Sequence, residues 1–536
     1  MVLGTEKFHI SLGHNDDSIR ASANLDSVSF WNECAKRLTW FKTWEKTLDW
    51  NPPFAKWFVG GQINASYNAL DIHQGKKSSK TAIFWEGEDR SERVITYSEL
   101  YKQVKKFANV LKTLGVETGD RVTIYLPMVP ELIISMLACA RIGATHTVVF
   151  SGFSSTSLKD RVEDSKSKII ITADGGFRKG KLIKLKEIVD ESASKVSSVE
   201  HVIVLRRANN EINLNQDDKL WSDLMLNASE DCDAEKLDSA HPLYILYTSG
   251  TTGKPKGVLH GTGGYLTHLY STYQWAFDIE DDDVYFCTAD IGWVTGHSYV
   301  TYGPLLHGAT QVMYEGAPDY PNPSRMWEII QKYNVTIFYT TPTALRMFMK
   351  FGNDIPRSFN LSTLRLLGTV GEPINPEVWK WYFDVIGNNK CPIIDTWWQT
   401  ETGGMMISNL PGIETVPLKP GSASKPIPGV EITVVDDNGH EVENNTKGSL
   451  IIQRPWPGML LTLWNDDEKY KNVYWSKFDG VYYPGDYAIK DDDGYLWLLG
   501  RSDDVLKVAG HRIGTAELES SLVSVSYTHL TLPTKA

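Results

Sequence analysis

The stretch Leu243-Tyr-Ile-Leu-Tyr-Thr-Ser-Gly-Thr-Thr-Gly-Lys-Pro-Lys-Gly257 decides how the rest of the chain is interpreted. Its first five residues predict a buried strand that runs directly into a loop of glycines, hydroxyls and lysines. Glycines let backbone N–H groups converge on a phosphate chain, hydroxyls donate further hydrogen bonds, and Lys254 supplies positive charge. The loop predicts a phosphate site, although by itself it also fits a surface loop. It is not a Walker A loop, because Thr248 and Pro255 stand where that pattern needs Gly and Ser or Thr.

Strands and helices alternate on the N-terminal side of this loop. Thr96 and Glu99 form a capping box before a helical pattern, and Gly143 ends a second one. The predicted strands are 122–126, 146–150, 169–171, 201–205 and 243–247. This alternation predicts an α/β fold with a parallel, helix-covered sheet whose ligands bind at the carboxyl ends of the strands. After residue 400 the chain becomes rich in glycine, proline and β-patterns, which predicts a smaller β-subdomain with strands near 429–435, 448–452, 480–483 and 495–499.

Composition excludes several classes of protein. The chain has 536 residues, 42% of them hydrophobic, and a formal net charge of −12, which argues against nucleic-acid binding. Five scattered cysteines without a CxxC pair fit a reducing compartment. The start shows no secretory pattern, and the longest apolar run, 132–140, is too short for a membrane span. We therefore expect a cytoplasmic protein that does not enter membranes; its oligomeric state is not predicted.

Two further segments have plain structural interpretations. The tryptophans of the first 75 residues predict a layer packed on the main body. They are Trp31, Trp40, Trp44, Trp50 and Trp57. The acidic run 280–283 predicts a solvated turn rather than a metal site. His297, in Trp293-Val-Thr-Gly-His-Ser298, is expected to be a packed histidine and not a catalytic base.

Further motifs follow the glycine-rich loop in order. They are Gly371-Glu-Pro373, Asp395-Thr-Trp-Trp-Gln-Thr-Glu401, Tyr483-Pro-Gly-Asp486, Gly500-Arg-Ser-Asp-Asp504 and Lys507-Val-Ala-Gly-His-Arg512. With that loop they resemble the adenylate-forming superfamily, which includes acyl-CoA synthetases, luciferases and peptide-synthetase adenylation domains. Because the similarity extends to the Trp-rich start, the chain resembles the acetate-activating acyl-CoA synthetases most. The resemblance implies a multi-lobed adenylate-forming domain of two α/β subdomains and a β-subdomain, followed by the start of a small α+β lid.

The resemblance also implies a reaction and a set of residues. ATP would activate acetate as acetyl-adenylate, with release of pyrophosphate, and coenzyme A would then displace AMP; the substrates are ATP, acetate and CoA, with Mg²⁺ as the metal. The implied catalytic residues are Thr248, Lys254, Glu401, which would also hold Mg²⁺, and Arg512. The implied nucleotide site adds Thr251, Thr252, Gly371, Glu372, Pro373, Asp395, Thr396, Trp397, Trp398, Gln399, Thr400, Asp486 and Arg501.

Two more subsites follow from the same resemblance. The acyl pocket would consist of Trp293, Val294, Thr295, Val370 and Trp398. The indole of Trp398 would leave room for about one or two carbons, and propionyl-CoA and 3-hydroxypropionyl-CoA synthetases remain alternatives because such pockets tolerate small changes. The CoA site would consist of Arg178, Lys179, Gly180, Lys181, Thr295, Asp319, Ala509 and Gly510. In this site Lys181 replaces a more usual arginine and loses its bidentate fork.

The match to relatives stops after about residue 524. The implied divisions are a Trp-rich layer (1–75), the adenylate-forming domain (76–502), a hinge at Asp503 with the start of a lid (503–524), and a tail that resembles non-native sequence (525–536). Relatives carry a late lysine that contacts the reacting carboxylate, so this shortened chain is expected to adenylate weakly. A non-catalytic nucleotide-binding protein is the alternative from another class.

Overall fold

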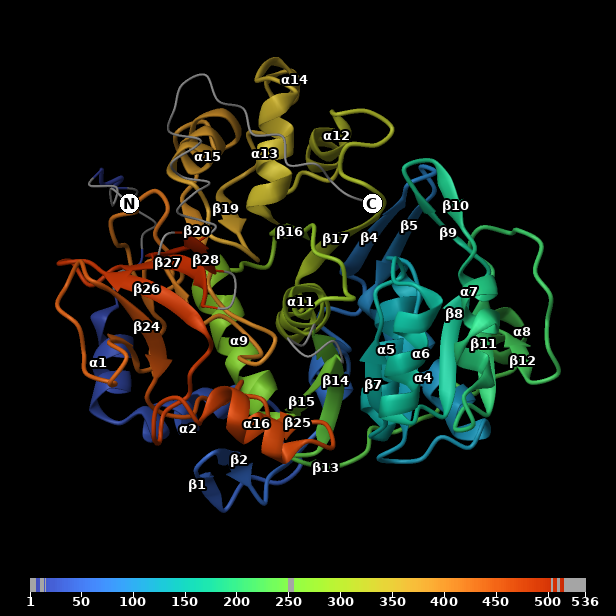
Figure 1. The fold of residues 1–536 in the computed structure, drawn as a ribbon. Helices are drawn as coiled ribbons and strands as arrows, with labels where there is room; N and C mark the ends of the chain where they lie inside the picture. The colour runs from blue at the N-terminus through green and yellow to red at the C-terminus, as the bar shows by residue number, and fades with distance from the viewer. Residues whose placement is uncertain are drawn as a thin grey trace.

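The computed structural model describes residues 6–9, 14, 16–248, 255–502, 505–508 and 511–514 (Figure 1). Within this part of the chain, three sheets have four or more strands. Two of them are mostly parallel and covered by helices, and the third is antiparallel. This arrangement confirms the predicted α/β class with two α/β subdomains and a β-subdomain.

The first sheet has eight strands and contains the strand that precedes the glycine-rich loop. In spatial order they are β12 (Asp218–Leu220), β11 (His201–Leu205), β8 (Ile169–Ala173), β6 (Arg121–Tyr125), β7 (Thr145–Val148), β14 (Pro242–Thr248), β15 (Lys256–Gly261) and β25 (Thr462–Leu463). Pairing is parallel from β12 to β14 and antiparallel beyond. Strands β6 and β8 are rich in Val, Ile and Thr and almost wholly buried, as parallel strands covered on both faces must be.

Helices cover this sheet with the predicted start and stop signals. The principal ones are α4 (Tyr97–Thr113), α5 (Pro130–Ile142), α6 (Ser155–Ser165), α7 (Leu185–Glu191) and α8 (Trp221–Leu226). Thr96 and Glu99 form both bonds of the capping box, and Gly143 ends α5 at φ +75°, a left-handed conformation that glycine adopts without strain.

The second sheet has seven strands. In order they are β20 (Ile393–Asp395), β19 (Leu366–Thr369), β18 (Ile337–Thr340), β16 (Val284–Cys287), β17 (Thr310–Glu315), β4 (Thr81–Gly87) and β5 (Glu92–Thr96). All pairs are parallel except β4 with β5. Helices α12 (Arg325–Lys332), α13 (Pro342–Lys350), α14 (Asp354–Arg357) and α15 (Pro376–Trp381) lie at the top in Figure 1. Helix α9 (Gly263–Phe277) is buried on nearly every face.

The third sheet is the predicted β-subdomain. Its antiparallel strands are β23 (Ile432–Val435), β24 (Lys447–Ile452), β26 (Asp486–Lys490) and β27 (Leu496–Arg501). The predicted strand at 480–483 is wrong: only Tyr482 pairs, in an isolated bridge with Ile452. The chain there leaves α16 (Asp467–Tyr474) and turns at Gly480 (φ +71°), so one residue alone comes alongside β24.

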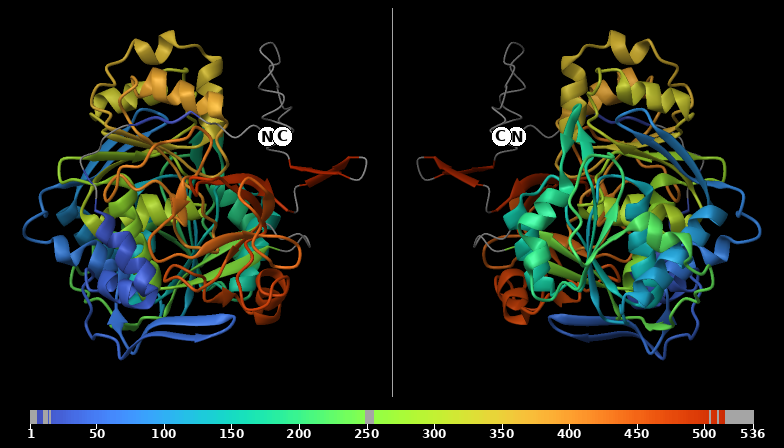
Figure 2. Two further views of the ribbon diagram at one scale, coloured as in Figure 1. Left: turned by 90° about the vertical axis from the view of Figure 1, so that its left-hand side faces the viewer. Right: turned by 90° about the vertical axis from the view of Figure 1, so that its right-hand side faces the viewer.

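The N-terminal segment packs on the main body, as its tryptophans indicate. Trp31 on α2 (Ser27–Ala35) is fully buried, donates from Nε1 to the Gly429 carbonyl at 3.0 Å, and stacks on His268 of α9. The hairpin β1 (Lys46–Asn51) and β2 (Phe54–Val59) lies at the lower edge of the molecule (Figure 2).

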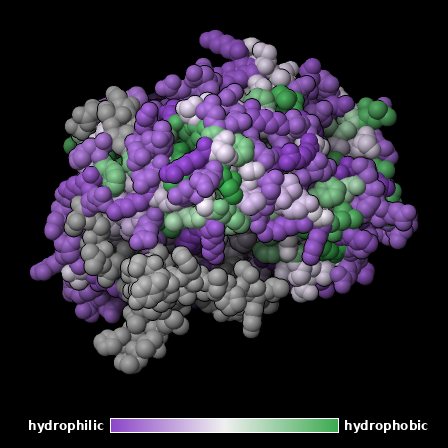
Figure 3. All heavy atoms as spheres, turned by 90° about the horizontal axis from the view of Figure 1, so that it is seen from above, coloured by the Kyte–Doolittle hydropathy of each residue, from purple (hydrophilic) through white to green (hydrophobic). Residues whose placement is uncertain are grey.

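The acidic run 280–283 is only partly the solvated turn that we predicted. Asp283 is buried and pairs with Arg365 at 2.5 Å, because the guanidinium compensates its charge, whereas Asp281 pairs with Lys77 at the surface. Across the described residues, no group of acidic, His or Cys side chains could hold a metal by itself. Nor is any described helix long and apolar enough to cross a bilayer. The face seen from above is largely hydrophilic (Figure 3).

Candidate active site

A cavity of about 350 Å³ lies where β19 and β20 end beside the third sheet. Ten of its lining residues belong to the predicted nucleotide site: Gly371, Glu372, Pro373, Asp395, Thr396, Trp397, Trp398, Gln399, Asp486 and Arg501. They come from four separate motifs, and the fold brings them together. The sequence did not predict Gly421, Ala423, Leu498 and Gly500, which complete the wall.

Polar side chains at one end of this cavity contact one another. Gln399 donates from Nε2 to the Asp486 carboxylate at 2.5 Å and to the Pro484 carbonyl at 3.1 Å. Arg501 pairs in register with Asp486 across β26 and β27, and its guanidinium donates to the same carbonyl at 3.3 Å. A largely buried carboxylate beside an amide and a guanidinium is suited to accept hydrogen bonds from the hydroxyls of a sugar.

The opposite wall is the turn at 371–373. Gly371 has φ +97°, a left-handed conformation in which a larger residue would be strained. Glu372 holds this turn against α13, because its carboxylate accepts from Thr343 N at 2.6 Å and pairs with Arg346 at 2.9 Å. The Glu372 carboxylate is therefore already bonded to Thr343 and Arg346 of the protein, and the turn presents its backbone to the cavity.

Asp395 stands at the end of β20 in the same wall. Its carboxylate accepts a hydrogen bond from Thr369 Oγ1 at 2.8 Å. Burial raises the pKa of Asp395 to about 7, a change that the Thr369 hydrogen bond only partly offsets. Thr396 follows; its hydroxyl donates to the Thr369 carbonyl at 2.8 Å and accepts from the Tyr339 hydroxyl at 2.7 Å.

A second cavity, of about 450 Å³, adjoins the first, because Gly371 lines both. Arg178, Trp293, Thr295 and Val370 line it, so it unites predicted acyl and CoA residues. Trp398 lines the first cavity and packs edge-on against Tyr299, with ring centroids 5.0 Å apart. Val294 packs partly buried against the core. The predicted acyl residues therefore stand around the junction of the two cavities rather than in one closed pocket.

Glu401 lies beside the start of β15. Its carboxylate accepts a short hydrogen bond from the Tyr474 hydroxyl and lies 3.6 Å from Lys256 Nζ, which in turn donates to the Tyr474 oxygen at 3.0 Å. Sequence reasoning missed both partners, although Lys256 belongs to the glycine-rich loop motif. Thr248 ends β14, and its buried hydroxyl has no partner within the described structure.

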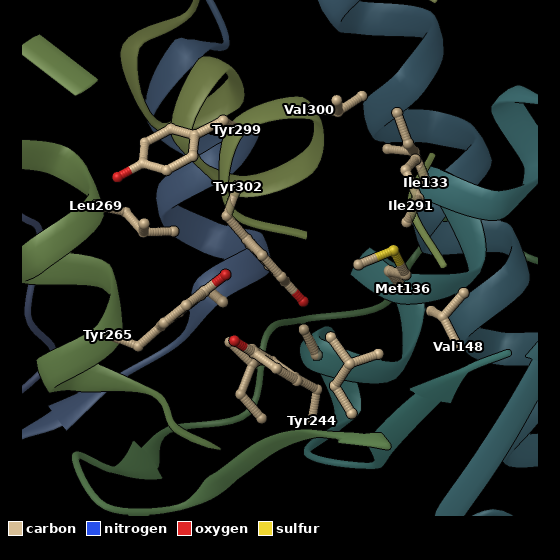
Figure 4. Packing of buried hydrophobic residues seen from close by; sticks show 14 of the residues in the cluster. Ile133, Met136, Val148, Tyr244, Tyr265, Leu269, Ile291, Tyr299, Val300 and Tyr302 are labelled. Atoms are coloured by element: carbon tan, nitrogen blue, oxygen red, sulfur yellow. The ribbon is translucent and has the colours of Figure 1, made fainter. Parts of the chain in front are cut away.

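The segment 399–405 is fixed by side chains from several elements. His260 Nε2 bonds the Thr400 carbonyl at 2.7 Å, Ser298 Oγ the Gly403 carbonyl at 2.7 Å, and Trp456 Nε1 the Thr402 carbonyl at 2.8 Å. Burial lowers the pKa of His260 to about 4, so this ring is neutral at pH 7 and Nε2 carries the proton that it donates. The His260 ring packs on Tyr244 and Tyr265, which gather with Tyr302 in the buried core (Figure 4).

His297 occupies the same buried layer. It stacks on His146, its Nδ1 lies 3.1 Å from the Trp293 carbonyl, and burial lowers its pKa to about 4. The prediction of a packed histidine is confirmed.

The predicted CoA residues 178–181 form a hairpin between β9 (Gly176–Arg178) and β10 (Lys181–Ile183). Arg178 lines the second cavity and lies 5.9 Å from the centre of the Phe150 ring. Lys179 instead pairs with Asp319 at 2.8 Å, so these two predicted residues contact each other, and Lys181 is exposed. Thr251, Thr252, Lys254, Asp503, Ala509 and Gly510 lie outside the described residues, as does the side chain of Arg512 on β29 (His511–Gly514).

Comparison with known proteins agrees with this geometry. The family model of AMP-binding enzymes matches residues 70–463, and that of the acetyl-coenzyme A synthetase N-terminus matches residues 17–69. Acetyl-coenzyme A synthetase from Chlorobaculum tepidum is 54% identical over 518 residues, which cover 96% of this chain and 78% of the relative. The chain belongs to the acetyl-coenzyme A synthetase family. Family members from Streptomyces avermitilis (56% identical) and Pyrobaculum aerophilum (55% identical) each match over 94% of this chain and 77% of their own length.

A solved structure shares the fold. Acetoacetyl-CoA synthetase from Streptomyces lividans superposes with a TM-score of 0.88 at 25% identity, over 96% of this chain and 82% of its own. The chain therefore has the fold of an adenylate-forming acyl-CoA synthetase, with two α/β sheets and a β-subdomain.

Proposed function

We propose that this protein is an AMP-forming acetate–CoA ligase, which converts ATP, acetate and CoA to acetyl-CoA, AMP and pyrophosphate. The observation that carries the proposal is the junction at Gly371, where a cavity lined by the nucleotide motifs meets one lined by Arg178, Thr295 and Val370. An acyl-adenylate formed in the first cavity would present its carbonyl carbon to a thiol that enters through the second. Membership of the acetyl-coenzyme A synthetase family supports acetate as the acid.

The nucleotide would lie in the first cavity. We propose that the 371–373 turn and residues 395–397 flank the adenine, and that Asp486 and Arg501 bind the ribose. Gln399 would orient the Asp486 carboxylate, because its Nε2 donates to one of the carboxylate oxygens. Thr248, Thr251, Thr252 and Lys254 of the glycine-rich loop would bind the β- and γ-phosphates, with Thr400 at the α-phosphate and Arg512 as a further donor.

Glu401 is the residue that fits Mg²⁺. Its carboxylate is largely buried beside Lys256, and hard cations bound to phosphates prefer one or two carboxylates together with phosphate oxygens. When bound, the ion would neutralise charge on the phosphates. Tyr474 and Lys256 would hold the carboxylate in place, since both contact its Oε1.

Two displacements then complete the reaction. An acetate oxygen attacks the α-phosphorus, and the bond from that phosphorus to pyrophosphate breaks; the thiolate of CoA next attacks the acetyl carbon, and the carbon–oxygen bond to AMP breaks. Thr295 and Val370 would line one side of the acyl group and Trp398 the other, and the indole would limit the length of the acyl chain. Arg178 and Lys181 would contact the CoA phosphates.

Five buried free cysteines support a reducing, cytoplasmic location.

The test follows product stoichiometry with the protein, Mg²⁺, ATP, CoA and one acid at a time: acetate, propionate or 3-hydroxypropionate. We expect acetyl-CoA and AMP in equal amounts, with acetate preferred over both other acids. ADP as the nucleotide product would contradict the reaction class, and a preference for propionate or 3-hydroxypropionate would contradict the substrate. ATP binding without any acyl-CoA product would support a nucleotide-binding role instead.

A further inference from the structure

Glu88 is a buried carboxylate whose hydrogen-bond partners in the described part of the chain are all backbone N–H groups of other segments. It follows β4 directly and is 4% exposed. Its Oε2 accepts from Lys179 N at 2.9 Å and from Ala317 N at 3.0 Å, and its Oε1 accepts from Gly180 N at 2.8 Å. One side chain therefore joins the end of the second sheet to the tip of the β9–β10 hairpin and to the segment after β17.

The hairpin tip has the conformation that makes this contact possible. Lys179 and Gly180 are the two loop residues, both with positive φ (50° and 72°), as in a type I′ turn. Both of their N–H groups point at one carboxylate. Bonds from N–H groups to an ionised acceptor are about twice as strong as neutral ones, and they compensate the buried charge.

The other end of the hairpin is also fixed to the body. Phe177 packs on the Arg207 guanidinium, 5.1 Å from its ring centre, and Arg207 pairs with Asp89 at 2.9 Å and Glu315 at 2.7 Å. Phe177 thus holds the base of the hairpin against Arg207, and Glu88 holds the tip through hydrogen bonds to the turn. Between them lies Arg178, whose side chain lines the second cavity.

We propose that Glu88 is a positioning residue for CoA: it fixes the hairpin so that Arg178 and Lys181 meet the 3′-phosphate of the incoming CoA. This inference rests on the proposed CoA role of the hairpin. Glu88 itself lines neither the first nor the second cavity, so its effect is carried by the turn. The amide of Glu88→Gln lacks the negative charge, and its NH₂ group would oppose one of the turn N–H groups.

The experiment measures binding to the full chain by calorimetry, with CoA, 3′-dephospho-CoA and ATP as separate probes. For Glu88→Gln we expect the Kd of CoA to rise about ten-fold, with the Kd of 3′-dephospho-CoA and of ATP changed less than about two-fold. Glu92→Gln is the matched control, an exposed glutamate on β5 that pairs with Lys332, and it should change none of the three. A purely structural role for Glu88 would weaken CoA and 3′-dephospho-CoA equally, and that result would overturn the proposal.

Arg178→Ala distinguishes an error in the proposed CoA site from an error in the proposed role of Glu88. If this variant binds CoA as the unaltered chain does, the proposed CoA site is wrong and the inference fails with it. If Arg178→Ala weakens CoA binding while Glu88→Gln leaves it unchanged, only the positioning role is wrong. Should Glu88→Gln fail to fold, Gly180→Ala disturbs the same turn, since its Cβ would lie 2.4 Å from the Tyr320 hydroxyl at a positive φ. The same selective loss of CoA binding is expected there, and equal loss for both probes would again overturn the role.

Discussion

Thr369 donates a hydrogen bond to Asp395 at 2.8 Å across the paired carboxyl ends of β19 and β20, inside the wall of the first cavity. This one bond does not compensate the burial of the carboxyl group, whose pKa rises to about 7. Such a group gains a proton near neutral pH at the place where we propose that the nucleotide binds. The free energy that folding loses by burying the Asp395 carboxyl group can be measured through its pH dependence.

Replacement of Asp395 by Asn is expected to change how stability depends on pH. Between about pH 4 and pH 7 the folded carboxyl holds a proton that the unfolded one, with a pKa of 3.8, has lost. The free energy of unfolding therefore falls as pH rises through this window, by up to about 4 kcal/mol, and Asn removes that fall. Urea unfolding measures the free energy of unfolding at pH 5 and pH 8, and the variant should be more stable relative to the unaltered chain at pH 8 than at pH 5. Equal differences at both pH values would contradict this, and Asp384→Asn, at an exposed position, is the control.

His260 should have the opposite dependence. Its pKa is about 4 when folded and 6.5 as the ordinary value, because burial disfavours the charged ring. Its contribution to stability is complete above pH 6.5 and is lost as pH falls toward 4. His260→Gln keeps an N–H donor for the Thr400 carbonyl but does not titrate. Between pH 7 and pH 4.5 the free energy of unfolding of this variant should therefore fall by about 2–3 kcal/mol less than that of the unaltered chain. Urea unfolding at both pH values tests this against His440→Gln, which alters an exposed ring.

The sequence predicted those parts of the site that depend on local chemistry. Gly371, Asp395 and Asp486 each sit in a short motif of turn-forming or polar residues, and the fold brings these motifs to one cavity. Buried strands such as β8 and β11 were equally predictable, because parallel strands covered on both faces read as continuous apolar runs.

What the sequence could not predict depends on contacts between distant segments. Tyr474 meets Glu401 from a helix 73 residues further along, and Glu88 meets Gly180 from 92 residues away. Neither residue lies in a pattern of its own. Leu498 lines the first cavity only because β27 passes beside it, and no alternation of polar and apolar residues marks such a neighbour.

Trp398→Gly is expected to shift the protein toward longer acids. The indole stands edge-on to Tyr299 beside the junction of the cavities, so its removal opens space for additional methylenes. Each methylene in an apolar pocket is worth about 1–3 kcal/mol, so the ratio of kcat/KM for butyrate to that for acetate should rise at least about ten-fold. Acyl-CoA formation from acetate through hexanoate measures it. An unchanged order of preference would contradict the assignment, and Trp464→Gly, which lines neither cavity, controls for loss of an indole.

Glu401→Gln is expected to remove the contribution of Mg²⁺ to ATP binding. The amide keeps the shape of the side chain but loses the charged oxygens that a hard cation prefers, so the Kd of Mg-ATP should rise about ten-fold or more. ATP in the presence of EDTA should bind as it does to the unaltered chain, since no metal then bridges the phosphates to the carboxylate. Calorimetry in the two buffers gives both values.

Two further variants fix the interpretation of that result. Glu431→Gln removes a partly exposed carboxylate that lies 3.4 Å from Arg454, and it should leave both Kd values unchanged. Tyr474→Phe keeps the Glu401 charge but removes its hydroxyl donor, so it should lower the free energy of unfolding by about 1–3 kcal/mol, while Mg-ATP still binds more tightly than ATP in EDTA. If Glu401→Gln weakened ATP equally with and without Mg²⁺, the carboxylate would be a structural partner of Tyr474 and Lys256, and the metal would have to be held elsewhere.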